Sequence, residues 1–221
     1  MPSYVVRVWI PDRPGALGAV ASRIGSVRGD LIGIDILERG AGMAVDELVV
    51  TLPSDDLVSL LVKEISEVDG VAVEDVQPVP GLGLPDPRLA ALETAALLVQ
   101  QPTPQLVLDA LVDRAAHDFS AAWVAVIDGD GRSVRAAFGS TPPASWIAAF
   151  VTGSRAASAD GPDDMAWASL RGAGLDLVVA RPGRPFRARE RRQLGALAGI
   201  ADVRWVELER VSGLRAHPSA S

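Results

Sequence analysis

The segment from Ile10 to Val20 places a tight turn between an apolar run and a helical pattern. The alternating apolar residues Tyr4–Ile10 predict a β-strand, and the prolines and the glycine that follow break it. Small residues after Gly15 then begin a helical pattern. Backbone N–H groups in the first turn of a helix have no partner within the helix, so they can bind an anion. We therefore expect a candidate binding site at this turn.

The strands and helices predicted in the rest of residues 1–79 must position this turn. Strands are predicted at Tyr4–Ile10, Leu31–Arg39, Ala44–Leu52 and Val71–Val79, and helices over Gly15–Arg28 and from an N-cap at Ser54 or Asp55 to Gly70. The buried side of the second helix is expected to consist of Leu57, Leu60, Leu61, Val62 and Ile65. The order β-α-β-β-α-β is that of a ferredoxin-like fold, in which four antiparallel strands carry two helices on one face. We expect this fold for domain 1–79 of an α+β protein.

The turn Asp12-Arg13-Pro14-Gly15-Ala16-Leu17, together with this order of elements, resembles the ACT domain, a small regulatory module that binds amino acids. The resemblance implies that Asp12 takes the amino group of an amino acid and that the backbone N–H groups of Gly15, Ala16 and Leu17 take its carboxylate. The electrostatics agree, because a helix N-terminus favours an anion and a nearby carboxylate favours an ammonium group. Pro14 shapes the corner whether or not a ligand binds.

The entry into the second strand departs from the family pattern. Family members often have Gly-x-Asn-Ile there, and the asparagine also holds the ligand. Here Leu31 stands at the position of the asparagine and Asp30 precedes it. Since side chains alternate along an extended segment, Asp30 and Leu31 point to opposite sides. Both are candidate ligand-binding residues, and two readings stay open: amino-acid binding at the turn, or a domain used only for pairing.

The predicted four-stranded sheet has two open edges, which invite pairing with another copy of the chain. ACT domains commonly associate side by side into one larger sheet, with ligands at the interface. The resemblance therefore implies a homodimer in which a second chain closes the site.

Residues 80–87 are rich in proline and glycine and predict a linker. The following residues, 88–211, predict a second domain with an antiparallel sheet. Its helices are expected over Arg88–Gln100, from Pro104 to Asp118, from Pro142 to Val151 and over Pro185–Val211, and its two hairpins are Ala121–Phe138 and Met165–Arg181. One side of the first helix is predicted to carry Leu89, Leu92, Ala96 and Val99, and the inner side of the second Leu106, Val107, Ala110, Leu111 and Ala115. The residues after 211 read as a disordered tail.

This second half resembles a GAF domain, a small-molecule sensor fold with α/β architecture. The resemblance is carried by Trp123–Asp128, by the hairpin turn Asp128–Gly131, and by Leu175–Pro182 followed by Pro185-Phe186 and a helix. Between Phe138 and Met165 there is room for little more than one helix and a loop, where full sensor domains have further elements that enclose a ligand. Either a small pocket or a purely structural, dimerising role fits this half.

Composition narrows the classes of function. The chain has 221 residues, no cysteine and two histidines, so disulfides and thiolate chemistry are excluded, and we expect no metal, no cofactor and no enzyme activity. A net charge of −7 argues against a nucleic-acid-binding body. The arginines between Arg181 and Arg192 are interpreted as a solvated helix start. No apolar run is long enough for a membrane span and no signal sequence is apparent, so we expect a cytoplasmic protein.

The sequence therefore predicts a non-enzymatic regulatory protein that binds a small amino acid through its ACT-like domain, as a homodimer. The alternative is a ligand-free dimerisation or interaction module in signalling. Neither reading involves nucleic acid or a membrane.

Overall fold

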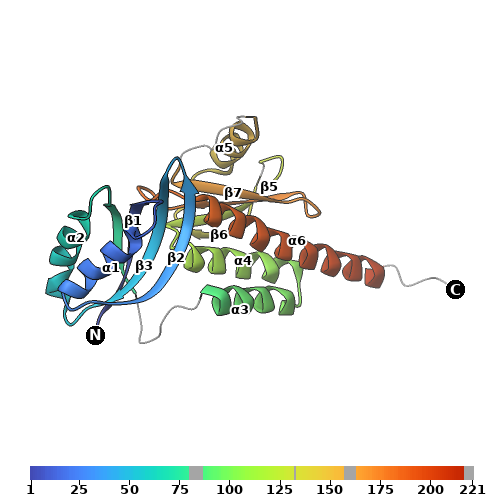
Figure 1. Cartoon of the computed structure of the whole chain (residues 1–221). Coiled ribbons are helices and arrows are strands. Elements are labelled where there is room, and N and C mark those ends of the chain that lie inside the picture. The colour runs from blue at the N-terminus through green and yellow to red at the C-terminus, as the bar shows by residue number, and fades with distance from the viewer. Residues whose placement is uncertain (80–86, 132, 157–162, 217–221) are drawn as a thin grey trace. The chain divides into compact units, whose positions relative to one another are not determined.

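The computed structural model describes residues 1–79, 87–131, 133–156 and 163–216. The chain divides into two compact units, Met1–Pro85 and Asp86–Ser221 (Figure 1). Both belong to the α+β class, and each contains one four-stranded antiparallel sheet. Most of the predicted linker, residues 80–86, lies outside the described residues. Within the described ranges, no helix combines the length and the apolar character that crossing a membrane requires.

The first unit has the predicted order of strands and helices. Its elements are β1 (Ser3–Pro11), α1 (Ala16–Ser26), β2 (Asp30–Gly40), β3 (Met43–Thr51), a short 3-10 helix (Asp55–Leu57), α2 (Val58–Ser66) and β4 (Ala72–Pro78). The strands lie in the order β2-β3-β1-β4, so the two strands that are first and third in the chain form the centre of the sheet. The turn after β1 therefore leaves the sheet from a central strand.

The core of this unit lies between one face of the sheet and the two helices. Val6 and Val8 of β1 point to this face together with Leu48 of β3, because alternate residues of a strand share a face. Val20 and Ile24 of α1 pack against them at helical spacing. Burial of such side chains contributes about 1.5–3 kcal/mol each.

The second helix differs from its prediction in two respects. Leu61 and Ile65 are its buried residues, whereas Leu60 is 42% exposed, because a position one residue from Leu61 is rotated by about 100° around the helix. The side chain of Ser54 makes no cap hydrogen bond. Asp55 instead accepts a hydrogen bond from the hydroxyl of Tyr4, which raises the pKa of Tyr4. The start of this helix is thus tied to β1 rather than capped locally.

The second unit surrounds its sheet with helices on both faces. Its elements are α3 (Pro87–Gln100), α4 (Pro104–Asp118), β5 (Trp123–Asp128), β6 (Val134–Gly139), α5 (Ala144–Ala156), β7 (Met165–Leu170), β8 (Leu175–Ala180) and α6 (Ala188–Ala216). The strand order is β6-β5-β8-β7, so the two predicted hairpins join through β5 and β8. One core contains residues of α4 and α6, and the other is closed by Ile147 and Val151 of α5. All six residues of β8 are buried as a result.

Three expectations about the helices of this unit are corrected by the structure. The stripe on α3 faces solvent, since Leu89, Leu92 and Val99 are exposed, while Leu98 is buried. Leu106 of α4 is also exposed. Residues 212–216 belong to α6, although the sequence assigned them to the tail; residues 217–221 lie outside the described residues.

The inward side of α3 includes a polar contact. Thr94 is buried, and its hydroxyl donates a hydrogen bond to Asp118 Oδ2 of α4 at 3.2 Å. Burial raises the pKa of Asp118, and the bond from Thr94 opposes that rise. Thr94 and the fully buried Leu98, four residues later, together mark the side of α3 that faces the unit.

Arg181 is buried rather than solvated, which corrects the interpretation of the arginine cluster. Its Nη2 donates to Glu190 Oε2 at 2.7 Å and to the carbonyl of Pro185 at 2.8 Å, and its Nη1 donates to the carbonyl of Phe119 at 3.1 Å. The guanidinium carbon also lies 3.9 Å from the ring centroid of Phe186. Glu190 in turn accepts the N–H of Arg187, the reciprocal contact of a capping box. One guanidinium thus joins the end of α4, the turn after β8 and the start of α6.

Substitution of Arg181 tests this role. Arg181→Met should lower the free energy of unfolding of the second unit by about 3–5 kcal/mol, because it leaves Glu190 buried without its cation. Arg171→Met, at an exposed turn position, should change it by no more than about 0.5 kcal/mol. Urea titration followed by circular dichroism measures both. Equal midpoints for the two variants would contradict a structural role for the Arg181 contacts.

Candidate functional site

The turn after β1 is shaped by its backbone. The N–H of Asp12 donates to the carbonyl of Gly42 at 2.9 Å, which extends the pairing of β1 with β3 by one residue. Gly15 then takes the N-cap position of α1 with φ of 88°, in the left-handed region. Residues with a Cβ rarely adopt this conformation, so glycine is required there. No side chain caps α1.

Two N–H groups at the start of α1 are available to a ligand. The N–H of Ala16 donates to the carbonyl of Arg13 at 3.3 Å, and that of Ala19 donates to the carbonyl of Gly15 at 3.0 Å. For the N–H groups of Leu17 and Gly18, the part of the chain that the structure describes provides no acceptor. The predicted donor Ala16 is therefore partly engaged, and Gly18 is a donor that the sequence reasoning did not name.

A second turn supports this corner. Gly70, between α2 and β4, has φ of 75°, and a Cβ built on it would lie 2.8 Å from Pro11 Cγ. The close approach is possible only because Gly70 has no side chain. Arg13 and Asp69 also form an ion pair at 3.7 Å, but both side chains are largely exposed, so its contribution to stability is small. The two turns approach each other closely at Gly70 and Pro11.

Asp46 is a functional candidate that the sequence reasoning missed. It lies in β3 opposite Val8, on the face of the sheet that the helices cover, and it is 5% exposed. Its Oδ1 has no hydrogen-bond partner among the described residues. The signal in the sequence is a carboxylate at a strand position that alternation assigns to the core, between Ala44 and Leu48. Such a group costs stability unless something compensates its charge.

The surroundings of Asp46 disfavour the negative charge of its carboxylate. Burial raises the pKa of the Asp46 carboxyl, the negative charges of Asp12 and Asp35 raise it further, and the positive charge of Arg39 partly opposes them. Asp12 thus lies within electrostatic reach of Asp46, at the same end of the sheet. An ammonium group placed near the two carboxylates would relieve their repulsion. The free N–H groups of α1 offer the complementary anion site.

Asp30 and Leu31 do not join this site within one chain. Leu31 pairs with Val50, which in turn pairs with Tyr4, so it lies at the level of the start of β1. Eight residues of β1 separate that level from Asp12, or about 26 Å along the strand. Leu31 packs against the core, and Asp30 is exposed. In one chain only Asp12 and the residues from Pro14 to Leu17 lie together at the turn.

In the second unit, the glycine-rich hairpin between β5 and β6 is a turn held by side chains. Ser133 and Arg135 both donate to the carboxylate of Asp128, and the bond from Ser133 is the main reason that the pKa of Asp128 is lowered. Gly131 has φ of 71°, and a Cβ there would lie 2.3 Å from Ala148 Cβ. Over the described ranges, no three His, Cys, Asp or Glu side chains form a group that could hold a metal ion.

Comparison with known proteins gives structural similarities of low score. No protein-family model and no curated protein matches the chain. The ACT domain from GTP pyrophosphokinase of Chlorobium tepidum is 16% identical, with a TM-score of 0.29, and the match covers 36% of this chain and 100% of that one. A formyltetrahydrofolate deformylase from Pseudomonas putida is 14% identical, with a TM-score of 0.31, 45% of this chain and 39% of that one being covered.

A protein of unknown function from Galdieria sulphuraria is 12% identical, with a TM-score of 0.32, and the match covers 81% of this chain and 97% of that one. One of these three structures is thus an ACT domain. At TM-scores this low, none of them decides the fold of either unit, a ligand or an activity.

The left-handed Gly15 yields a prediction with an internal control. Gly15→Ala should lower the free energy of unfolding of the first unit by about 1–2 kcal/mol, because alanine is strained at this φ although the space is open. Gly18→Ala, three residues later inside α1 and also in open space, should raise it by roughly 0.5–1 kcal/mol. Urea denaturation of the full chain measures both. The same sign for the two variants would contradict the assigned turn geometry.

The buried carboxylate of Asp46 yields a pH-dependent prediction. In the folded protein the pKa of Asp46 lies above its ordinary value of 3.8. Ionisation of Asp46 therefore weakens the folded state as the pH rises from 3.8 through the folded pKa. Asp46→Asn should therefore stabilise the ligand-free protein at pH 7, by about 1 kcal/mol. The gain should shrink as the pH falls toward 3.8 and disappear well below it, where Asp46 is protonated in both the folded and the unfolded state.

Thermal denaturation across this pH range measures the effect, and the exposed Asp56→Asn is the control, for which we expect no such gain. If Asp46→Asn destabilises the protein at pH 7, Asp46 has a stabilising partner and the assignment is wrong.

Proposed function

We propose that this chain is a non-enzymatic, cytoplasmic regulatory protein that binds a small amino acid at the turn between β1 and α1, and that it acts as a homodimer. In this proposal the first unit is a ferredoxin-like, ACT-like domain and the second is a GAF-like domain. The second unit transmits the signal or pairs with another copy.

The buried Asp46 is the observation that carries the proposal. A buried carboxylate oxygen without a hydrogen-bond partner destabilises a folded protein, and incompletely compensated groups of this kind concentrate at functional sites. Asp46 lies on the sheet face that α1 and α2 cover, within electrostatic reach of Asp12. A cationic ligand group at this place supplies the missing compensation.

The charges and donors around the turn favour a zwitterion, a ligand with one negative and one positive group. The two unpartnered N–H groups of Leu17 and Gly18 favour a carboxylate, and the partial positive charge at the N-terminus of α1 adds to this preference. Asp12 and Asp46 favour an ammonium group. A small amino acid carries both of these charges on one molecule.

A homodimer would complete the proposed site. The sheet ends in β2, in which Ile34 and Ile36 are partly exposed. Antiparallel pairing of two β2 strands would place the Asp30 end of one copy beside the Gly40 end of the other, at the sheet end where Asp12 lies. This arrangement would bring the predicted residues Asp30 and Leu31 toward the turn from a second chain.

The second candidate function is an interaction module without a ligand. It is favoured by the bond from Ala16 N–H to Arg13, which already fills part of the anion site, and by the apolar residue at position 31. This candidate predicts a self-associating protein whose melting temperature ignores added metabolites.

Isothermal titration of the full chain against the twenty amino acids separates the two candidates. We expect heat and a raised melting temperature with at least one small amino acid. Asp12→Ala and Asp46→Asn should each weaken that binding about tenfold or more, the cost of one charge-assisted contact. Asp56→Asn, exposed in the 3-10 helix, is the matched control and should bind normally.

Absence of both heat and thermal shift with every amino acid would leave the interaction module. Turnover of any substrate that Asp12→Ala abolishes would contradict the non-enzymatic part of the proposal.

A further inference from the structure

The outer side of α6 carries a stripe of residues that the second unit leaves uncovered. Arg192, Ala196, Gly199, Val203 and Glu207 follow one another at intervals of three and four, so they share one side of the helix. All five are exposed, and Val203 is exposed to 72%. We call this set the α6 stripe. The centre of the stripe consists of two small residues and a valine, and its two ends are charged. This pattern is typical of a helix that packs against another helix.

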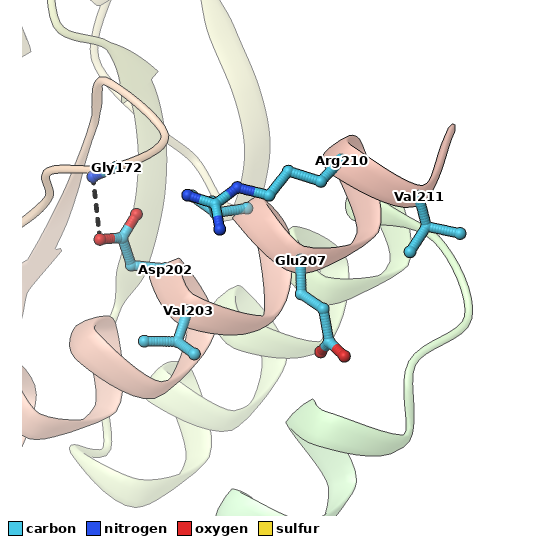
Figure 2. Close-up of a pocket in the computed structure, with 7 residues that line it drawn as sticks. Gly172, Asp202, Val203, Glu207, Arg210 and Val211 are labelled. Atoms are coloured by element: carbon cyan, nitrogen blue, oxygen red, sulfur yellow. Dashed lines mark hydrogen bonds between the residues drawn. The ribbon is translucent and has the colours of Figure 1, made fainter. Parts of the chain in front are cut away.

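Grooves lie on both sides of the α6 stripe. One has a volume of about 420 Å³ and separates α6 from Val99 of α3, and the other, of about 520 Å³, lies beside Gly172 in the turn between β7 and β8. Val203 lines both, so it forms the ridge between them. Figure 2 shows the second groove, with Val203 and Glu207 projecting from the same side of α6.

The apolar surface continues onto α3. Leu92 is 69% exposed and Val99 is 49% exposed, and α3 is packed beside α6. Arg204 closes the boundary between the helices, since its guanidinium donates to the carbonyl of Gln101 at 2.9 Å and to Glu207 Oε2 at 2.8 Å. Val99 of α3 and the α6 stripe therefore form one surface across two helices.

We propose that this surface is a contact between two copies of the chain, in which two α6 helices pack antiparallel and cross near Gly199 and Ile200. The charges of the stripe identify the occupant. In an antiparallel pair centred there, Arg192 of each copy lies opposite Glu207 of the other, and Ala196 lies opposite Val203. Val203 of each copy then packs against the small Ala196 of the other, and opposite charges lie together at both ends of the contact.

The same charges disfavour a parallel pair. In parallel packing Arg192 would face Arg192 and Glu207 would face Glu207, which places like charges together at each end. Glu207 already accepts a bond from Arg204, but it is 61% exposed and a carboxylate has room for a second donor. The small residues Ala196 and Gly199 allow the helices to approach closely at the centre.

This surface lies entirely within the second unit, so the inference goes beyond the amino-acid site and does not depend on it. It also differs from pairing through β2. Each surface pairs with itself, and a chain that uses both would form a closed tetramer or an open chain of molecules.

Charge reversal tests the antiparallel arrangement in the full chain. Arg192→Glu and Glu207→Arg should each weaken self-association about tenfold, because each turns two attractive pairs into repulsive ones, and the double variant should restore it. Glu209→Arg, exposed on another side of α6, should have no such effect. Sedimentation equilibrium measures the dissociation constants, and amino-acid titrations of the same variants should be unchanged.

Cysteine cross-linking gives an independent measurement, because the chain has no cysteine of its own. Under oxidation, Gly199→Cys should form a disulfide-linked dimer, as should the double variant Arg192→Cys with Glu207→Cys. Arg192→Cys alone should not, since the two copies of this position lie at opposite ends of the contact. Glu209→Cys is the negative control.

The outcomes are distinct. Failure of the double charge variant to restore association, or absence of a cross-link through Gly199→Cys, would overturn the proposal. Rapid cross-linking of Arg192→Cys alone would show a parallel pair and overturn the antiparallel arrangement. If association persists unchanged in every α6 variant, the copies pair elsewhere.

Discussion

The buried guanidinium of Arg181 is the contact on which the architecture of the second unit depends. It replaces water by an ion pair with Glu190, by backbone carbonyls from two other segments and by the ring of Phe186. Removing a charge from water is tolerated only when such partners are all in place. The end of α4, the turn after β8 and the first turn of α6 therefore form together, and the direction in which the long helix leaves the sheet is fixed at its first turn.

The first unit buries a charge without this compensation. Asp46 lies where alternation in β3 predicts an apolar side chain, and burial of its charge lowers the stability of the folded state. The two buried charges, Arg181 and Asp46, therefore have different consequences. A fully paired buried charge fixes the position of a helix, whereas a buried carboxylate oxygen without a hydrogen-bond partner, as in Asp46, is a place where a partner from solution would add stability.

The order of elements could be predicted from the sequence because it rests on periodicity and on prolines and glycines. Orientation could not. The stripe on α3 shows that Leu92 and Val99 share a side, but it is the side of Thr94 and Leu98 that faces inward. Register is equally invisible in the sequence, so Leu31 and Asp12 could not be placed at opposite ends of the sheet. Asp46 was missed and Arg181 was wrongly assigned to the surface, because the burial of a charged side chain depends on neighbours that are distant in the sequence.

The contact between Gly70 and Pro11 has a mechanical consequence. Because no side chain separates them, an inward displacement of the turn after β1 pushes directly on the turn before β4. Ala72, two residues beyond Gly70, is the first residue of β4, and β4 ends at Pro78, just before the segment that leads to the second unit. The turn of the candidate site is therefore in direct contact with the turn from which β4 begins.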